Sequence, residues 1–456
     1  MSFRFVMSWI LLLCTARVLH AQNPPAPPIQ APQNPPGTQP AAVTPPTSAS
    51  PQTLTLKQAE ALAIRNHPRI QEAKYLAASA AARVTQAQSV YYPQAYGSLT
   101  GVEAEHDSRI AAGALNNPVI YDRYANGVTV SQYITDFGRT HQLVKSNRER
   151  AQAEAENVTT SRADVLLRAD QAFFNALKAQ SVLQVAQQTV QNRQVVADQI
   201  GELAKHQLKS DLDVSFAQVD LGQAKLLLVQ AQNDVQATLA ELSAALGYAN
   251  QQPFTLIEET MTETGPPADT EKWIDDGLQN RPEILSQKLN TNAAQSYATA
   301  EKDLWLPTIS AVGEAGLTPF REDQLGPRYA AAGFNVNVPL FNGRLYGALE
   351  SEANNQAHAE QQHLRDLQET IARDIRTAWL NASSAYQRLG LTRQISAEAN
   401  QALNLAQSRY KLGLGSIVEL SQAQLNQTQA QIAETTAKYD YQSQISALNY
   451  AAGLLH

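Results

Sequence analysis

The sequence predicts an α+β membrane protein made of two tandem repeats, each with the order helix, strand, strand, long helix, helix. Two observations indicate the repeat: short motifs recur at fixed offsets, and the apolar pattern changes in the same order within each half. A third observation is compositional. Of the 456 residues 43% are hydrophobic but only 7% are aromatic, and Ala, Gln, Leu and Glu fill long stretches. This composition is typical of extended helices rather than of one thick core.

The N-terminal part of the chain precedes the repeats. Arg4 is followed by an apolar run that ends at Cys14 and by a small residue at Ala21, which predicts a signal peptide over residues 1–21. The run is too short to cross a bilayer as a helix. Residues 22–52 carry 11 of the 22 prolines, so we expect an extended, solvated linker there.

Five pairs of markers align the two halves. They are Asn66 and Asn280, Pro93 and Pro307, Arg139 and Arg344, Phe173 and Trp379, and Gly247 and Gly453. The first two pairs are 214 residues apart and the others 205 or 206, so a loop in the first half carries the extra residues. We therefore place the first repeat at 53–247, a linker at 248–268 and the second repeat at 269–456.

Each repeat is predicted to begin with helices. In the first half Thr55 and Gln58 form a capping box, Pro68 restarts the helix, and Pro93 ends it. Between the prolines, apolar residues recur every three or four positions, which predicts helices packed nearly parallel. This seam consists of Ile70, Ala73, Ala77, Ala80, Val84, Ala87 and Tyr91.

Apolar and polar residues then alternate, which predicts strands with one apolar and one polar face. The apolar positions are Val128, Val130 and Ile134 in the first half, and Phe334, Val336, Val338 and Leu340 in the second. We expect hairpins at about 94–135 and about 307–341. Strands of roughly ten residues are long enough to cross a bilayer when they are tilted.

The helical pattern resumes after each hairpin and continues to Lys205 in the first half and to Lys411 in the second, a length of roughly 100 Å. Breaks at about 205–213 and about 409–419 then reverse the chain into return helices. The first return helix has an apolar residue every three or four positions. These are Ala217, Leu221, Ala224, Leu228, Ala231 and Val235.

The second break contains the glycines of "RYKLGLGSIVELSQA". A dinucleotide-binding loop should follow a strand and carry a third glycine, whereas here a helix precedes the stretch and Val418 stands at the third position. We interpret Gly413-Leu414-Gly415 as a helix stop with glycine in a left-handed conformation and Ser416 as the next N-cap, with Glu419 completing a capping box. Ser210 is the equivalent N-cap in the first half.

Four strands in one chain make an open sheet, and hydrocarbon does not tolerate its unpaired edges. If the strands span a membrane, several chains must pool them, with two chains giving eight strands and three giving twelve. An eight-stranded barrel is filled by its own side chains, so a conduit needs the larger number. The alternative is a non-membrane periplasmic coiled-coil scaffold or adaptor protein in which these segments are loops.

With these motifs the chain resembles the TolC family of outer-membrane channels. The resemblance rests on "NHP" and "NRP", "YYP" and "WLP", "ITDFGR" and "LFNGR", and the glycine stretch, in order from about Thr53 to Gly453. It implies a homotrimer in the bacterial outer membrane, with a 12-stranded transmembrane β-barrel continued by a periplasmic α-helical barrel. It also implies a passive exit channel of a tripartite efflux pump or type I secretion system. Its partners would be a periplasmic adaptor (membrane fusion) protein and, indirectly, an inner-membrane transporter.

The resemblance also implies roles for the two tips. The residues that match adaptor-contact positions are Leu208, Ser210, Leu412, Gly413, Leu414, Gly415 and Ser416. Asp213 and Glu419 match the acidic ring of the periplasmic aperture, and Tyr410 matches a member of its latch. Some relatives carry a latch arginine where Gly415 stands, so that lock differs here. Alternatively, the tip residues only build turns, and the two acids only stabilise helix N-termini.

Other functions are not indicated. The formal net charge is −7 with no basic tract, so we expect no nucleic-acid partner. Cys14 is the only cysteine, which excludes cysteine-ligated metal and thiol catalysis in the mature chain. His358 and His363 do not share a helix face, and no nucleotide-binding or hydrolase motif occurs in a plausible context. We therefore expect no enzyme, metal or cofactor.

Overall fold

Residues 52–105, 119–259, 264–266, 269–321 and 323–455 are described by the computed structural model of the chain. The predicted signal peptide, Cys14 and the predicted Pro-rich linker up to residue 51 lie outside the described residues. The chain divides into two units, Met1–Ala49 and Ser50–His456, and every described residue belongs to the second.

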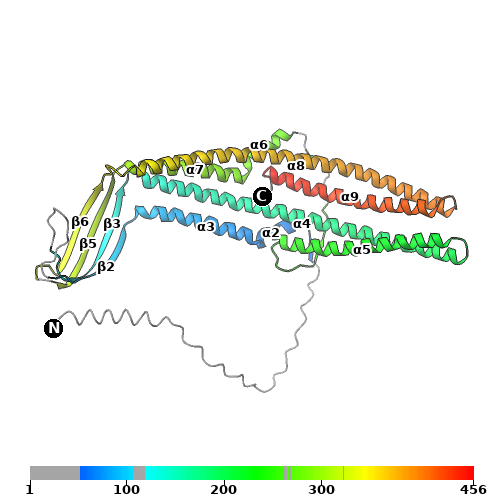
Figure 1. Cartoon of the computed structure of the whole chain (residues 1–456), viewed down its shortest axis with the longest axis horizontal. Helices are drawn as coiled ribbons and strands as arrows, with labels where there is room; N and C mark the ends of the chain where they lie inside the picture. Colours follow the sequence, from blue (N-terminus) through cyan, green and yellow to red (C-terminus); the bar gives the residue numbers. More distant parts are fainter. Residues whose placement is uncertain (1–51, 106–118, 260–263, 267–268, 322, 456) are drawn as a thin grey trace, which may run out of the picture. The chain divides into compact units, whose positions relative to one another are not determined.

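Two sets of helices with matching lengths confirm the predicted tandem repeats (Figure 1). Each set has helices of 11, 21, 67 and 35 residues in that order. The first set is α2 (Leu56–Asn66), α3 (Pro68–Gln88), α4 (Arg139–Lys205) and α5 (Asp211–Ala245). The second set is α6 (Thr270–Asn280), α7 (Pro282–Lys302), α8 (Leu345–Lys411) and α9 (Ile417–Ala451). A 3-10 turn follows the second helix of each set, as η1 (Ser89–Tyr91) and η2 (Asp303–Trp305).

The first helix starts as its sequence predicts. The backbone N–H of Thr55 donates to the side chain of Gln58 at 3.1 Å, and the Thr55 hydroxyl accepts from the Gln58 N–H, so the capping box is complete. Pro68 and Pro282 are the first residues of α3 and α7, where their missing N–H costs no hydrogen bond.

The two hairpins join into one antiparallel sheet at the end of the unit opposite the helical tips (Figure 1). The strands are β2 (Gln94–Val102), β3 (Arg123–Thr135), β5 (Thr308–Arg321) and β6 (Arg328–Asn337). Their order is β2-β3-β5-β6, so β3 and β5 connect the two repeats through the middle of the sheet. Strands β2 and β6 are its edges, and each has one row of backbone groups without a neighbouring strand in the described sheet.

The sheet register separates an apolar face from a polar face. Val128 lies opposite Gly97 on β2 and Ala315 on β5, and Thr129 lies opposite Tyr96 and Glu314. Paired residues share a face, so the alternation continues across the strands. The apolar face also carries Leu99, Val130, Leu317, Phe334 and Val336, whereas the other carries Ser131, Ser310 and Asn335. The apolar side chains are exposed in the single chain.

One part of the strand assignment was wrong. Strand β6 ends at Asn337, so Val338 and Leu340, which the alternation assigned to it, lie beyond its end. Asn337 lies opposite Thr308, the first residue of β5, so the residues after Asn337 have no neighbouring strand to pair with. Period-two alternation alone does not reveal such a stop.

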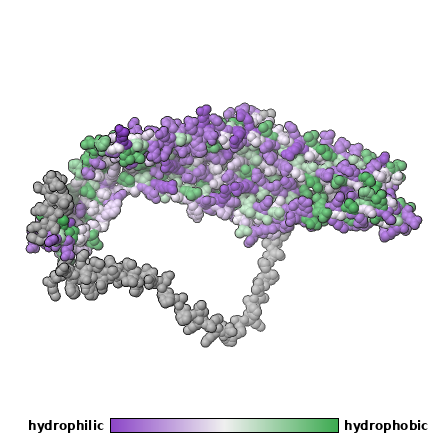
Figure 2. Space-filling model, viewed as in Figure 1, coloured by the Kyte–Doolittle hydropathy of each residue, from purple (hydrophilic) through white to green (hydrophobic). Residues whose placement is uncertain are grey.

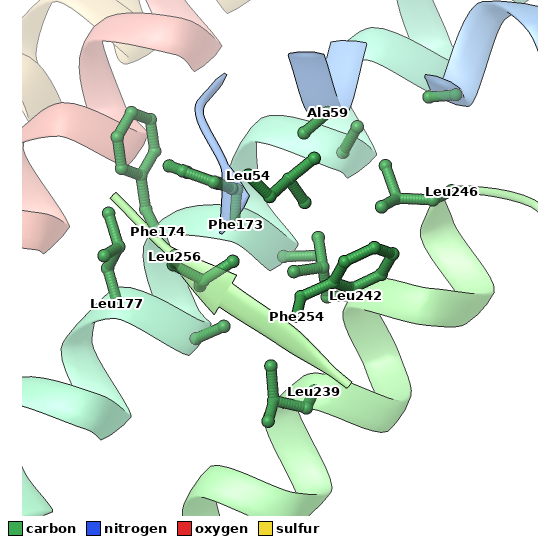
Figure 3. Packing of buried hydrophobic residues seen from close by; sticks show 14 of the residues in the cluster. Leu54, Ala59, Phe173, Phe174, Leu177, Leu239, Leu242, Leu246, Phe254 and Leu256 are labelled. Carbon is green, nitrogen blue, oxygen red and sulfur yellow. The ribbon is translucent and has the colours of Figure 1, made fainter. Parts of the chain in front are cut away.

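A core near the middle of the helices is formed mainly by the first repeat, with Tyr439 of α9 from the second. Phe173 of α4 and Leu242 of α5 are almost fully buried there, together with Ala59 of α2 (Figure 3). Two three-residue strands complete this core, β1 (Gln52–Leu54) and β4 (Phe254–Leu256), which pair in parallel. Strand β4 lies in the segment predicted as the inter-repeat linker. Three-residue strands are too short to show periodicity, so the sequence did not indicate them.

The predicted seam of the first return helix is buried. Ala217, Leu221, Ala224, Ala231 and Val235 are buried along α5, and Leu228 is half-buried. The seam of α3 is weaker, since only Ile70, Ala73 and Ala80 are buried in that helix. Small residues dominate both seams, which allows close approach of nearly parallel helices.

Truncating Leu242 to Ala should destabilise the helical part by about 3 kcal/mol, because a fully buried side chain leaves a cavity. Thermal unfolding followed by helical circular dichroism measures the loss. Leu76→Ala on α3 is the control, since Leu76 is 55% exposed in the single chain. Equal effects of the two substitutions would contradict the position of this core.

Candidate functional site

The candidate site is formed by the two connections between the long helices and their return helices, α4 to α5 and α8 to α9. Both lie at the end of the unit far from the sheet (Figure 1). The two hairpins pack on each other there, because Ile200 and Leu221 of the first hairpin share a buried cluster with Tyr410, Ile417 and Leu420 of the second. The tips are therefore held as one structure within the chain.

The second tip ends α8 as predicted. Gly413 has φ +73°, the N–H of Leu414 donates to the Arg409 carbonyl at 2.8 Å, and the N–H of Gly413 donates to the Tyr410 carbonyl at 3.1 Å. This is a Schellman helix stop with glycine in the left-handed position. The first tip has the same pattern of hydrogen bonds with Gln207 at φ +55°. A side chain at that position carries a strain that glycine avoids.

The return helices begin at Ser210 and Ser416, as predicted. The Ser210 hydroxyl accepts from the Asp213 N–H at 3.2 Å, and the Asp213 carboxylate accepts from the Ser210 N–H at 3.1 Å. The first tip therefore has a complete capping box. Ser416 accepts from the Glu419 N–H at 3.1 Å.

The predicted capping box at the second tip is only half correct. The Glu419 carboxylate does not return to Ser416 but accepts from Nε of Arg409 at 3.0 Å. A second nitrogen of the same guanidinium donates to the Leu414 carbonyl at 3.1 Å. A charged guanidinium is a stronger partner for a carboxylate than a backbone amide, so the ion pair prevails. The longer side chain of Glu, compared with Asp213, also reaches the preceding helix.

Arg409 is a functional candidate that sequence reasoning missed. Its signal was a basic residue in the last turn of a helix, ten positions before the acid of the next helix. Gly415 leaves the space for this ion pair, since a Cβ there would lie 3.2 Å from the Cβ of Arg409 and 3.2 Å from Oε2 of Glu419. A side chain at position 415 would therefore require this pair to shift by a few tenths of an ångström.

Tyr410 connects the two tips through Lys209. Its ring lies 3.8 Å from Nζ of Lys209 on the first tip, a cation–π contact. Burial, together with the negative charge of Asp213, raises the pKa of the Tyr410 hydroxyl. That hydroxyl is buried and has no hydrogen-bond partner among the described residues. Asp213 is near enough to act on Tyr410 electrostatically, but its carboxylate bonds to Ser210.

The surface around the tips is apolar. Leu208 and Leu212 of the first hairpin are 68% and 64% exposed, and Leu412 and Leu414 of the second are 74% and 68% exposed. Figure 2 shows apolar residues, in green, over this end of the hairpins, whereas the surface over the middle of the helices is mainly hydrophilic. A cluster of exposed leucines on a single chain is typical of an interaction surface.

A groove runs between the return helices α5 and α9 just behind the tips. Its volume is about 480 Å³, and Phe216, Val219 and Leu425 form part of its apolar wall. Arg193 also lines it, and burial lowers the pKa of this guanidinium although the charge of Asp220 opposes the shift. Nη1 of Arg193 is buried without a partner in the part of the chain that the structure describes.

Metal chemistry has no support at this site. The described segments of the chain contain no group of three or more His, Cys, Asp or Glu residues placed to hold a metal ion. Nor does any helix among the described residues have the length and apolar character that crossing a membrane requires. The tips offer apolar contacts, the Glu202–Lys205 and Arg409–Glu419 ion pairs, and a groove.

Comparison with known proteins gives one family and several similar structures. The model of the family "Outer membrane efflux protein" matches residues 61–248 and 273–454. The outer membrane efflux protein BepC of Brucella suis is 23% identical over 72% of this chain and 71% of its own length. The outer membrane protein TolC of Vibrio cholerae is 22% identical over 73% and 77%. The structure of the outer membrane protein VceC from Vibrio cholerae superposes with a TM-score of 0.75 and 18% identity over 87% of this chain and 96% of that one.

Replacing Gln207 by Gly should stabilise the first tip by about 1 kcal/mol, because glycine adopts positive φ without strain. Gly413→Ala should weaken the second tip by a similar amount. Hydrogen exchange of the Leu208 and Leu414 amides measures the two changes, since these amides close the helix stops. A change of about fivefold in opposite directions is expected. Exchange rates that do not change would show that the left-handed positions carry no strain.

Proposed function

Since the chain belongs to the outer membrane efflux protein family, we propose that three copies of it form one exit duct across the bacterial outer membrane. The chain is an outer-membrane exit channel for efflux or secretion, with a large periplasmic portion. In the proposed assembly the strands of each copy contribute one third of a 12-stranded β-barrel. The long helices of the three copies continue this barrel as a periplasmic helical tube.

The two-faced sheet is the observation that carries the proposal. Strands β2 and β6 have free edges, and unpaired backbone groups cost several kcal/mol each in hydrocarbon. Pairing β2 of one copy with β6 of the next removes these edges and closes a barrel. The face with Val128 and Phe334 then contacts lipid, and the face with Thr129 and Glu314 lines water. Twelve strands leave an aqueous interior, whereas eight do not.

Exposed apolar residues on the long helices support the same assembly. Val195 of α4, Leu226 of α5 and Leu391 of α8 are more than half exposed in the single chain. Burying such residues against neighbouring copies would add to the stabilisation that each hairpin obtains from its own seam. A length of 67 residues gives helices of roughly 100 Å, long enough to cross much of the periplasm.

The partner that we propose at the tips is a periplasmic adaptor with a helical hairpin of its own. The exposed leucines Leu208, Leu412 and Leu414 and the groove between α5 and α9 offer the apolar stripe that an amphipathic helix needs. Ser210, Gly413, Gly415 and Ser416 shape the two turns. An inner-membrane transporter, reached through the adaptor, would supply the energy, and the duct itself would be passive.

The two tips differ, so the adaptor meets two unlike surfaces in each copy. The first has Gln207 and a capping box on Asp213, whereas the second has Gly413 and the Arg409–Glu419 ion pair. We propose that Asp213 and Glu419 form the acidic ring of the periplasmic aperture, with six carboxylates in three copies. Such a ring favours hydrated cations. Arg409 neutralises part of this charge, and Tyr410 holds the tips together through Lys209.

The scaffold or adaptor alternative does not fit the architecture. An adaptor is expected to have one helical hairpin between β domains, whereas this chain has two hairpins of equal length and one shared sheet. A coiled-coil scaffold would need no sheet with an apolar face exposed to its surroundings.

The purified mature protein should have the mass of three chains in detergent and should form small, cation-preferring pores in planar bilayers. Asp213→Asn combined with Glu419→Gln should reduce the ratio of cation to anion permeability at least twofold, because it removes the ring charge. Reversal potentials in a salt gradient measure this ratio. A soluble species of another size that does not conduct would reject the duct.

Leu412→Asp combined with Leu414→Asp should lower site-specific cross-linking to the adaptor at least tenfold, because charge replaces apolar contacts at the tip. The mass of the assembly in detergent should not change. Leu76→Asp on α3 is the matched control, since Leu76 is 55% exposed and remote from the tips. Cross-linking that survives the double substitution would reject the tip as the contact.

A further inference from the structure

A second cavity lies away from the tips, near the middle of the helices. Its volume is about 370 Å³, and it is lined by residues of α2, α4, α6 and α9 together with the segment 264–266. Glu60 of α2, Asp170 of α4, Trp273 of α6 and Tyr441 of α9 are among its lining residues. Its size is that of a small-molecule site.

The acidic side of this cavity is incompletely satisfied. Asp170 is 1% exposed, and its Oδ1 has no hydrogen-bond partner among the residues that the structure describes. The Ser446 hydroxyl and the Glu60 carboxyl interact with the Asp170 carboxyl group. An unpartnered carboxylate oxygen is costly in a protein interior, and most such groups have a partner.

No positive side chain among the described residues lines the cavity to balance these two acids. Among its described lining residues, Glu60 and Asp170 are the only charged ones. Outside the lining, Lys57 and Glu259 act on Glu60 with opposite signs. Burial raises the pKa of Asp170 to about 7, and the Glu60 carboxylate contributes to this shift whereas Ser446 opposes it. Burial also raises the pKa of Glu60. At alkaline pH the cavity therefore holds negative charge that no described lining residue neutralises.

The repeat architecture does not require an acid at this position. The equivalent residue in α8, 206 positions later, is Arg376, which is exposed and paired with Glu271 at 3.2 Å. A buried carboxylate in α4 is thus a feature of one repeat and not a requirement of how the long helices pack. It costs stability unless something compensates its charge.

We propose that this cavity binds an organic monocation, with its positive nitrogen against Asp170 and Glu60 and its apolar body against Trp273 and Tyr441. Two carboxylates supply the charge, and the aromatic rings add cation–π attraction and apolar contact. A metal ion fits less well, because the described residues contain no group of three His, Cys, Asp or Glu side chains that could hold one. The site is separate from the proposed adaptor contact at the tips and is not part of the proposed duct function.

Binding of such a cation depends on the proton that Asp170 carries. A protonated Asp170 offers no charge, so the cation and the proton compete for the site. Since the pKa of Asp170 is about 7, affinity is full at pH 8 and falls as the pH drops below 7. For competition with one proton the decrease approaches about tenfold per pH unit.

Isothermal titration calorimetry of the full mature protein in detergent tests the proposal, with benzylammonium as the probe, because its N–H groups can donate to the unpartnered Oδ1 of Asp170. We expect binding at pH 8 that is several-fold weaker at pH 6, and no binding of the anion benzenesulfonate. Equal affinity for neutral benzyl alcohol would show an apolar cavity only and would overturn the proposal. So would the absence of probe binding at pH 8, or an affinity independent of pH.

Variants locate the site. D170N should lower the affinity for the probe at least tenfold and remove its pH dependence, and E60Q should lower it less. D198N is the matched control, because Asp198 lies exposed on the same helix and loses the same charge. If D170N alters the helical circular dichroism signal, W273L is tested instead. The W273L variant should bind the probe more weakly and keep the pH dependence of binding. Wild-type affinity in both D170N and W273L would place the probe elsewhere and reject this cavity.

Discussion

The free edges of the four-stranded sheet constrain every larger feature of this protein. Strand β2 ends one side of the sheet and β6 the other, and the two come from different repeats. Each copy in the proposed barrel therefore offers a first-repeat strand to one neighbour and a second-repeat strand to the other. Since β3 and β5 pair inside each chain, the sheet also fixes how the two repeats are oriented at the membrane end. The sheet therefore also sets how the long helices that follow it are oriented where they begin.

The two repeats have helices of the same length but differ in the residues that make contacts at the tips and near the middle of the helices. Helices of 67 and 35 residues occur in both, so the two hairpins reach the same level. Equal reach is a requirement for a tube that ends in one rim. At that rim the helix stops, the acids and the ion pairs differ between the repeats. The same is true near the middle of the helices, where Asp170 and Arg376 occupy equivalent positions. The two repeats thus share the lengths of their helices but differ in the side chains at equivalent positions.

Much of this fold could be predicted from the sequence, because its elements are long and strongly periodic. The tandem order, the strand alternation and the glycine stop at 413 depend on local rules that a single sequence displays. The failures have a common physical origin in contacts between distant residues. Strand β6 ends at Asn337 because its partner β5 begins opposite it at Thr308, and the Glu419 carboxylate bonds to Arg409 instead of to its own N-cap. The β1–β4 pair joins residues about 200 positions apart.

The roles of individual tip residues stay predictions, since they concern contacts with other chains. Asp213, Tyr410 and Glu419 do come together at one end of the chain, as the repeat offsets indicated. Their partners within the chain, Ser210, Lys209 and Arg409, could not be ranked from spacing alone. Whether a carboxylate bonds to an amide or to a guanidinium depends on the distance and burial of the two donors. Both quantities are known only from the three-dimensional structure.

The parallel pair of β1 and β4 has a consequence for how the chain acquires its structure. Gln52 pairs with Phe254, so the first repeat cannot complete its own core until a segment that follows it is available. Chains emerge from the N-terminus onward, and pairing across such a separation carries a large loop-closure entropy. The first repeat is therefore not an independent folding unit, although it looks like one in the sequence. The apolar faces of its helices stay exposed until the residues of β4, at the boundary of the second repeat, are available to cover them.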